Sequence, residues 1–331
     1  MGAAAAIKFA QIEPVGQCNL RCQMCPVQFR AAGPPHGPLA FMTLDTFRRL
    51  LDEMPALEEL HLQGLGEPLM HPRFFEMVRL AHARGVRVST NTNLTLLSRR
   101  RAHECVESGL AELHASLDGA HAEIFERIRR RARFSRVLRH LRELLKVRRA
   151  LGAATPRVRL VMVVMRDNLQ ELPDVVELAA ELGIGELFVQ HLCHDFGEES
   201  LPLAYAPMRR FVDEQSLLHE DAARIETSFG KARERAAACG LELRLPRTQP
   251  VADERIGRCD WPWRGPYISY TGDAMPCCMV ATPDRANLGN MAEHGVAAVW
   301  GGERYRAFRD ALASDSPPAV CRSCAVYNGV F

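Results

Sequence analysis

Apolar residues in the first two thirds of the chain follow two alternating patterns. Short runs rich in Val, Ile and Leu, typical of strands, alternate with longer stretches in which apolar positions recur every three to four residues, as on one face of a helix. This alternation predicts an α/β fold of repeated strand–helix units around a parallel sheet. The expected strands cover residues 7–15, 59–63, 86–91, 112–117, 158–165 and 186–192.

Residues that commonly end or begin helices lie where this scheme needs them. Gly85 and Gly109 each stand between a helical stretch and the next strand, where a left-handed residue ends a helix. Asn168, followed three residues later by Glu171, predicts a capping box that opens a helix over the next residues. Gly183 then ends that helix.

The remainder of the chain has a different pattern. Residues 196–255 show helical periodicity around 208–219 and 221–239 and no clear strand, so we expect a helical bridge. Beyond it, a strand-like run at 267–270 with a Thr-Gly-Asp turn predicts a hairpin. One further helix is expected over 296–312.

Composition and charge exclude several classes of protein. Of the 331 residues, 47% are hydrophobic and 25% charged, which is typical of a folded globular chain. The net charge of +2 gives no overall field for nucleic acid or an anionic membrane, and we expect neither as a partner. No signal peptide or run of 18 apolar residues occurs, so we expect a cytoplasmic protein. Eleven cysteines in that compartment point to metal or redox chemistry rather than disulfides.

Three cysteines follow the first expected strand in a C-x3-C-x2-C pattern. Cys18, Cys22 and Cys25 are close enough in a loop to bind one metal centre. A structural zinc site is the alternative, but zinc takes four protein ligands and no further Cys or His occurs before His36. Three thiolates would leave one iron of a four-iron cluster without a protein ligand.

This spacing resembles the defining motif of the radical S-adenosylmethionine (SAM) enzymes, which carry it after the first strand of a partial (β/α)6 TIM barrel. The resemblance implies that Cys18, Cys22 and Cys25 hold a 4Fe-4S cluster whose open iron binds SAM. It also implies that one electron cleaves SAM to a 5′-deoxyadenosyl radical, which abstracts hydrogen from the substrate.

Further family-like segments stand at the ends of expected strands, where barrel enzymes gather their chemistry. The sequence 61–68 resembles a GGEP element with Leu65 between its glycines, and 116–119 reads SLDG. The resemblance implies that the Glu67 carboxylate accepts hydrogen bonds from the ammonium group of SAM. It implies SAM contacts for Gly64, Gly66, Glu67, Ser89, Asn91, Ser116, Asp118, Gln190 and His191.

Several of these polar residues also have a purely structural interpretation. Asn91 and Asp118 are common turn and cap residues. His191, Cys193 and His194 follow the sixth strand and are weak candidates for catalysis, since a histidine at a strand end commonly has a structural role. Arginines recur between residues 127 and 139, where we expect a solvated helix face, with a contact to an anionic group as the alternative.

The second group of cysteines lies near the end of the chain. Cys259, Gly272 and Cys277 form C-x12-G-x4-C, and Cys321 and Cys324 form a late C-x2-C. This order resembles the SPASM and twitch extensions of radical SAM enzymes. It implies that these four cysteines hold one auxiliary 4Fe-4S cluster in a small α+β domain. A zinc ribbon is the alternative, and Cys278 is either a buried neighbour or another ligand.

We therefore expect a radical SAM core over residues 1–195, a helical bridge over 196–255 and a twitch/SPASM-like domain over 256–331. The predicted activity is hydrogen abstraction in a net oxidation of a small metabolite, with a flavodoxin or ferredoxin as the electron donor that the family implies. The first strand begins near residue 7, which favours a small molecule over a peptide held by an N-terminal domain. One alternative is a maturase that crosslinks a ribosomal peptide or protein. The other is a non-catalytic zinc-binding interaction protein.

Overall fold

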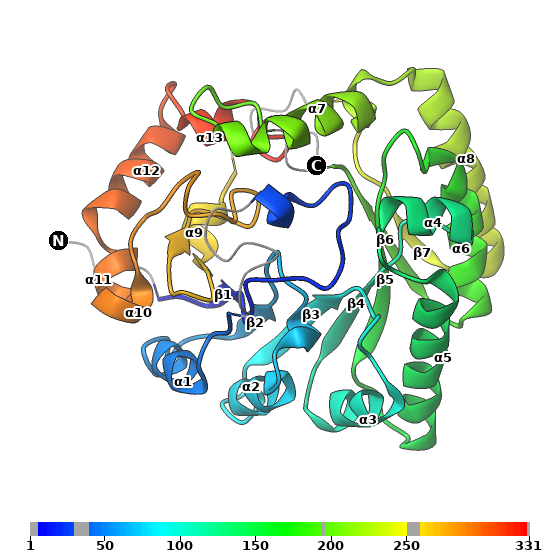
Figure 1. The fold of residues 1–331 in the computed structure, drawn as a ribbon, viewed down its shortest axis with the longest axis horizontal. Coiled ribbons are helices and arrows are strands. Elements are labelled where there is room, and N and C mark those ends of the chain that lie inside the picture. Colours follow the sequence, from blue (N-terminus) through cyan, green and yellow to red (C-terminus); the bar gives the residue numbers. More distant parts are fainter. Residues whose placement is uncertain (1–5, 30–39, 193–195, 250–258, 330–331) are drawn as a thin grey trace.

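A curved parallel sheet with helices on its outer face forms the centre of the molecule (Figure 1). The computed structural model describes residues 6–29, 40–192, 196–249 and 259–329. All six expected strands are present and pair in chain order, which confirms the partial barrel. They are β1 (Phe9–Ile12), β2 (Glu59–Leu62), β3 (Arg87–Thr92), β4 (Glu112–Ser116), β5 (Arg157–Val163) and β6 (Glu186–Gln190).

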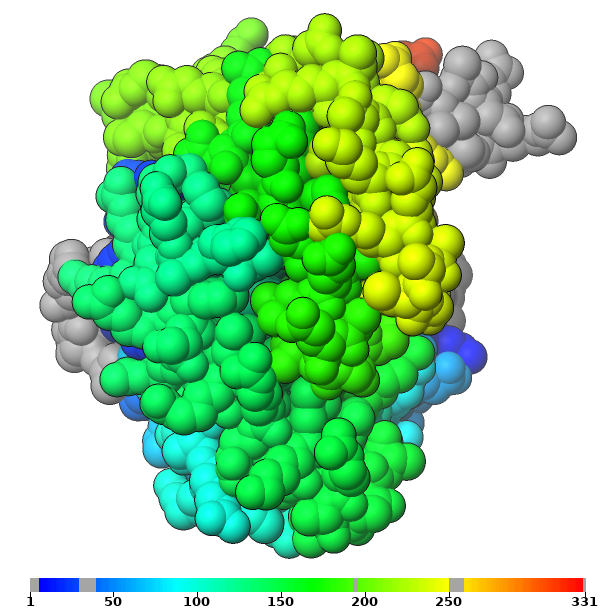
Figure 2. Space-filling view, turned by 90° about the vertical axis from the view of Figure 1, so that its right-hand side faces the viewer, coloured from blue at the N-terminus to red at the C-terminus, as the bar shows by residue number. Residues whose placement is uncertain are grey.

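Helices connect these strands and bury one apolar face each. In the first, the Thr43 side chain accepts a hydrogen bond from the backbone N–H of Thr46, and Phe47 and Leu50 point into the core. Gly85 and Gly109 have φ angles of +78° and +82°, as the sequence predicts. The helices are α1 (Leu44–Asp52), α2 (Phe74–His82), α3 (Arg99–Glu107), α4 (Ala122–Ile128), α5 (Phe134–Ala150), α6 (Leu172–Glu181), α7 (Ala206–Gln215) and α8 (Ala222–Cys239). Figure 2 shows the face formed by α4, α5, α6 and α8.

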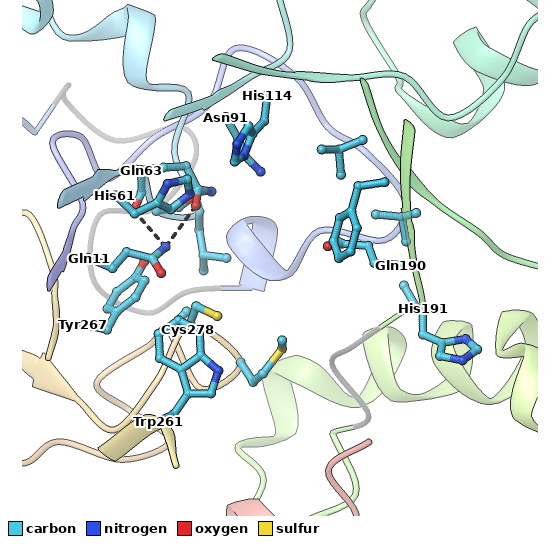
Figure 3. A pocket seen from close by; sticks show the side chains of 18 of the residues that line it. Gln11, His61, Gln63, Asn91, His114, Gln190, His191, Trp261, Tyr267 and Cys278 are labelled. Carbon is cyan, nitrogen blue, oxygen red and sulfur yellow. Dashed lines mark hydrogen bonds between the residues drawn. The ribbon is translucent and has the colours of Figure 1, made fainter. Parts of the chain in front are cut away.

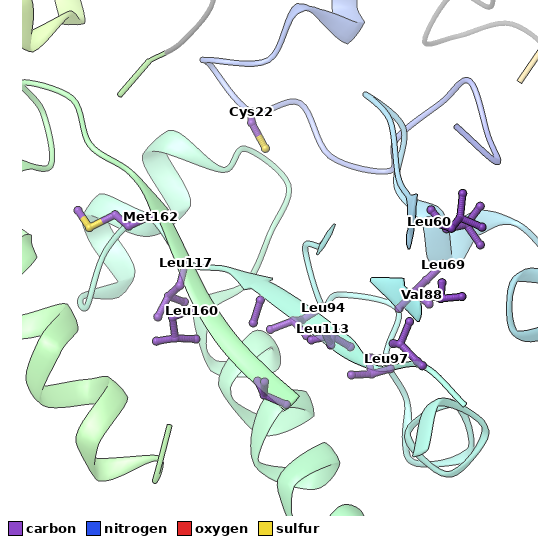
Figure 4. Packing of buried hydrophobic residues seen from close by; sticks show 14 of the residues in the cluster. Cys22, Leu60, Leu69, Val88, Leu94, Leu97, Leu113, Leu117, Leu160 and Met162 are labelled. Carbon is purple, nitrogen blue, oxygen red and sulfur yellow. The ribbon is translucent and has the colours of Figure 1, made fainter. Parts of the chain in front are cut away.

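The two faces of the sheet differ in polarity, because successive strand residues point to opposite faces. Outward positions such as Leu60, Val88 and Leu113 pack against the helices in the hydrophobic core (Figure 4). The alternate positions face the barrel interior and are largely polar. They include Gln11, His61, Ser89, Asn91, His114 and Arg159. The barrel interior can therefore bind a polar molecule.

The bridge contains a strand that the sequence pattern did not reveal. β7 (Glu242–Arg244) follows α8 and pairs in parallel with β6, so the expectation of no strand in 196–255 is wrong. The strand has three residues, two of them exposed and charged, so it carries no run of apolar residues to recognise.

The expected capping box at Asn168 is also wrong. A short 3-10 turn, Leu169–Glu171, precedes α6, and the Asn168 side chain makes no cap hydrogen bond. Its Nδ2 donates to the carbonyl oxygens of Asp118 and Val163, which ties the end of β4 to the end of β5. The Glu171 carboxylate accepts the backbone N–H groups of Ala120 and His121 at the start of α4 instead.

The C-terminal region continues the same sheet. β8 (Tyr267–Ile268) lies parallel to β1 and antiparallel to β9 (Ala274–Met275), which confirms the hairpin. The expected helix over 296–312 is two helices, α11 (Val296–Trp300) and α12 (Glu303–Ala313), because the chain bends at Gly301 and Gly302. The short helices are α9 (Trp261–Arg264), α10 (Met291–His294) and α13 (Ala319–Arg322). None of the described helices has the length and apolar character to cross a bilayer.

Candidate functional site

The first cysteine group lies in the loop between β1 and the short 3-10 helix Pro26–Phe29. Burial raises the pKa of the Cys18 thiol, and the nearby groups Glu67, Cys22 and Cys25 raise it further. Burial raises the pKa of Cys22 to about 12. The three thiols are thus neighbours in a poorly solvated place, where they ionise only if a cation compensates the charge. A bound metal centre supplies such compensation.

Residues 64–68, which we call the GLGEP segment, pack tightly against this loop. A Cβ at Gly66 would overlap the carbonyl oxygen of Val15 and lie 2.7 Å from that of Gln17. The backbone N–H of Glu67 donates to the same Gln17 oxygen at 3.0 Å. Gly64 similarly leaves no space for a Cβ beside the Glu13 side chain. Only glycine fits at these two positions, because a Cβ at either would collide with the chain that leads into the cysteines.

Two buried carboxylates tie the GLGEP segment to its neighbours. Glu67 accepts hydrogen bonds from the Thr92 hydroxyl (2.7 Å), the Asn93 backbone (2.8 Å) and the Leu69 backbone (3.1 Å). Glu13 accepts the backbone N–H of Leu65 at 3.0 Å. Sequence reasoning missed Glu13, although a carboxylate inside an apolar strand was a usable signal.

The SLDG segment ends in a buried ion pair. The Asp118 carboxylate lies 2.7 Å from Nε of Arg129, with exposed side-chain fractions of 0% and 9%, and also accepts the Val163 N–H at 2.9 Å. Burial alone would lower the pKa of Arg129, but Asp118 and Cys22 outweigh it and raise that pKa. The prediction of a solvated helix face for the arginines between 127 and 139 is therefore wrong for Arg129, which is buried. Its positive charge in turn opposes the effect of burial on the pKa of Cys22.

A cavity of about 360 Å³ lies inside the barrel, between the strands and the C-terminal region (Figure 3). We call it the chamber. Of the expected SAM contacts, Gly64, Asn91, Gln190 and His191 line it. The His191 ring points away from the chamber and bonds through Nε2 to the Arg247 carbonyl. Its other lining residues are Gln11, His61, Gln63, Leu65, His114, Arg159, Val161, Val163, Phe188, Leu192, Trp261, Tyr267, Cys278, Met279 and Ala281.

The remaining expected site residues lie at different depths. Ser89 sits one layer below Asn91, and its Oγ lies 2.8 Å from Nδ1 of His61. Ser116 is the last residue of β4 and is half-buried. Cys193 and His194, two of the candidates for catalysis, lie outside the described residues.

The chamber wall is polar but electrically balanced. Burial lowers the pKa of His61 to about 3 and also lowers that of His114, so both rings are neutral near pH 7. Nδ1 of His114 lies 2.7 Å from Oδ1 of Asn91. The Arg159 guanidinium is paired with Glu186 at 2.8 Å. The wall therefore offers hydrogen bonds without a large net charge.

The second cysteine group converges as well. Cys259, Cys277, Cys321 and Cys324 all line one small cavity in the C-terminal region. Burial raises the pKa of Cys277, and the neighbouring Cys278, Cys324 and Cys259 raise it further. Cys278 belongs to the wall of the chamber instead (Figure 3).

Among the residues that the structure describes, neither cysteine group brings three sulfur atoms within 4.8 Å of one another. A tetrahedral site with Zn–S bonds of about 2.3 Å holds its sulfurs about 3.8 Å apart. Within the described parts of the chain, the only three ligand atoms all within 4.8 Å of one another belong to His121, Glu171 and Asp174. The Glu171 carboxylate of this group already accepts two backbone hydrogen bonds at the start of α4, which explains its position without a metal. The donor set of both groups consists of thiolates, which are the ligands of iron-sulfur clusters.

Comparison with known proteins agrees with this geometry. Residues 12–179 match the radical SAM superfamily, and residues 259–325 match the SPASM iron-sulfur cluster-binding domain. The chain therefore belongs to the radical SAM superfamily and is a radical SAM enzyme with a C-terminal SPASM region.

Similar proteins act on different molecules. The chain is 26% identical to the tungsten-containing aldehyde ferredoxin oxidoreductase cofactor-modifying protein of Pyrococcus furiosus, over 97% of this chain and 88% of the relative. It is 28% identical to the AdoMet-dependent heme synthase of Methanosarcina barkeri, over 94% and 87%. The fold of Streptococcus suis SuiB, solved bound to its precursor peptide SuiA, matches with a TM-score of 0.71 and 15% identity, over 98% of this chain and 70% of SuiB.

Proposed function

We propose that this enzyme oxidises a small polar molecule held in the chamber by radical chemistry started at the Cys18, Cys22 and Cys25 loop. These cysteines would hold a 4Fe-4S cluster, and that cluster would supply the one electron that cleaves SAM into methionine and a 5′-deoxyadenosyl radical, which abstracts hydrogen. A second 4Fe-4S cluster is assigned to Cys259, Cys277, Cys321 and Cys324. The proposal rests on the position of the chamber between two connections: the segment 64–67 lines the chamber with Gly64 and packs against the chain that leads into Cys18, and Trp261 and Met279 line both the chamber and the cavity of the second cysteine group.

The residues around the first loop have definable tasks. Arg129 lowers the cost of thiolate charge at Cys22 and Cys25. Glu67 accepts one hydrogen bond at Oε2 from Asn93, so that oxygen has a further lone pair available for the ammonium group of SAM. We assign the remaining SAM contacts to Gly64, Gly66, Asn91, Gln190 and the segment from Ser116 to Asp118.

The chamber limits the substrate. The cavity of about 360 Å³ is near the lower end of ligand pockets, and the assigned SAM contacts Gly64, Asn91 and Gln190 line it too, so the space left for substrate suits a small molecule or a single residue of a peptide. Its histidines are neutral and its arginine is paired, so an uncharged polar group loses less solvation there than a carboxylate or phosphate. Trp261 and Phe188 provide apolar parts of the wall.

The position of Cys278 supports a role for the second cysteine group in turnover. It lines the chamber, while the preceding residue, Cys277, belongs to the second group. The substrate is therefore held within one residue of a ligand of the auxiliary cluster. This proximity favours a net two-electron oxidation. The 5′-deoxyadenosyl radical would remove a hydrogen atom, that is one electron and one proton, and the auxiliary cluster would accept the second electron from the substrate radical.

A maturase that modifies a peptide or protein is the second candidate. The likeness to SuiB and the 25% identity to a PqqA peptide cyclase from Bradyrhizobium diazoefficiens favour it. A peptide residue inserted into the chamber would meet the same neutral wall. For either substrate, we assign the electron supply to a flavodoxin or ferredoxin.

Metal analysis and isotope transfer test the proposal. Anaerobically reconstituted protein should contain about eight irons and eight acid-labile sulfides per chain. A content of about four irons with one zinc would refute the assignment of the auxiliary cluster. Zinc without acid-labile sulfide would refute the assignment of both clusters. Incubation with deuterated candidate substrates should place deuterium in 5′-deoxyadenosine for the true substrate, and a peptide that labels it would select the maturase.

A further inference from the structure

The turn between α4 and α5 forms the surface directly outside the cysteine loop. The backbone N–H of Arg21 donates to the carbonyl oxygen of Arg130 at 3.1 Å, and that of Gln23 donates to Ile128 at 3.0 Å. These two hydrogen bonds lie on either side of Cys22 in the chain. Figure 2 shows α4 and α5, in teal and green, beside the blue N-terminal segment. A molecule that binds this turn is thus brought close to the first cysteine group.

The arginines of the turn divide between the interior and the surface. Arg129 is buried against Asp118, whereas Arg130 and Arg131 are exposed. Arg131 has a φ of +74°, a left-handed conformation in which glycine is much less strained than a large side chain. An arginine at such a position points to a task for its charge at the surface.

The exposed arginines exceed the carboxylates available to them. Arg133 pairs with Glu126 at 2.8 Å, and Arg127 lies 3.9 Å from Asp167. The remaining four exposed arginines make no ion pair with any residue that the structure describes. We call them the arginine surface: Arg130, Arg131, Arg136 and Arg139. The whole chain has a net charge of only +2, so this excess is local.

We propose that the arginine surface docks an acidic one-electron carrier protein that reduces the first cluster. The proposal rests on the proposed function, because it assumes a cluster at Cys18, Cys22 and Cys25. One electron passes from the reduced carrier to the oxidised cluster, and no atom is transferred. Complementary charge accelerates such encounters and orients the partner. The four arginines do not line the chamber, which favours an electron carrier over an acidic substrate.

Stopped-flow reduction of the reconstituted protein tests the docking surface. An acidic flavodoxin in its hydroquinone form serves as the probe, and bleaching of the cluster absorbance gives the rate. Arg130→Glu/Arg131→Glu is the test variant. Lys146→Glu/Arg149→Glu is the matched control, because it makes the same change of charge about 20 Å along α5. Dithionite reduction of each protein checks that its cluster is intact.

At low ionic strength the test variant should be reduced by flavodoxin at least tenfold more slowly than the wild type, and the control within twofold of it. The wild-type rate should fall as salt is added, and the variant should lose most of that dependence. Equal rates for variant and wild type, or an equal loss in the control, would overturn the docking site. If flavodoxin transfer is unaffected but turnover of an acidic peptide substrate is lost, the surface binds substrate instead. Failure of dithionite to bleach any cluster in the wild type would count against the proposed function rather than the docking site.

Discussion

Cys277 and Cys278 are consecutive in the chain, yet they line different cavities. Cys277 lies with Cys259, Cys321 and Cys324 around the small C-terminal cavity, and Cys278 lies on the wall of the chamber. The two residues stand where the chain leaves β9 and enters a turn, which Ala281 closes by donating its backbone N–H to the Cys277 carbonyl oxygen, and this turn lets one position bind metal while the next faces substrate. Sequence spacing alone left both roles open for Cys278.

Replacing these two cysteines should therefore have different consequences. Cys277→Ala should lose about four irons per chain, because it removes a proposed ligand. Cys278→Ala should keep the full iron and sulfide content and change only turnover of substrate. Iron and sulfide analysis of anaerobically reconstituted protein measures both. A loss of four irons in Cys278→Ala alone would reverse the assignment.

Gly66→Ala should disrupt the cysteine loop, since its Cβ would collide with the carbonyl oxygen of Val15 and crowd that of Gln17. Backbone atoms cannot move away without shifting the chain that carries Cys18. We expect iron content to fall by about half, with the C-terminal cluster retained. Gly185→Ala is the control, because a Cβ there meets nothing within 4 Å. Normal iron content in Gly66→Ala would show that the loop tolerates the displacement.

Breaking the buried ion pair should be costly. Arg129→Met leaves the Asp118 carboxylate buried without its partner, and removing one member of such a pair typically costs about 3–5 kcal/mol. Thermal unfolding, followed by circular dichroism, should show a clearly lower midpoint. Arg127→Met, which affects an exposed arginine of the same segment, should leave the midpoint nearly unchanged. Similar midpoints for both variants would show that the Asp118 contact contributes little.

Stability should decline in mild acid because of the chamber histidines. The pKa of His61 is lowered to about 3 in the folded protein, below its value of about 6.5 in the unfolded chain. The unfolded state therefore binds more protons between these values, and stability is full above pH 6.5 and falls as the pH drops. At pH 5.5 the loss from His61 is about 1.4 kcal/mol.

The variant His61→Gln should lose less stability between pH 7.5 and pH 5.5 than the wild type, by about 1 kcal/mol. Urea unfolding at the two pH values measures the difference. If the free energy of unfolding of the variant depends on pH as that of the wild type does, groups other than His61 cause the loss of stability in acid.

Sequence reasoning located the elements whose signals are local. The strands from β1 to β6, the left-handed Gly85 and the hairpin whose turn contains Gly272 each follow from periodicity or turn preferences. Strand β7 was missed because its three residues contain too few apolar positions, and its place is fixed by pairing with β6. Tertiary contact overrode local preference at Asn168, whose amide ties two strand ends instead of capping a helix.

In the site, too, the features with local sequence signals were predicted and the features set by tertiary contacts were not. The cysteine spacings indicate which residues can share a metal centre, and the structure places each set together. Spacing could not indicate that Glu13 would support the GLGEP segment, that Arg129 alone of its run would turn inward, or that Cys278 would face the chamber. The positions of these three side chains depend on which distant segments pack together, and the local sequence pattern carries no information on such packing.

Formation of 5′-deoxyadenosine tests the central claim most directly. Reconstituted wild-type protein, given SAM and dithionite without oxygen, should release 5′-deoxyadenosine and methionine. The variant Cys18→Ala/Cys22→Ala/Cys25→Ala should release neither while retaining about four irons at the C-terminal cysteines. Cleavage of SAM by that variant at the wild-type rate would contradict the assignment of the first cysteine group.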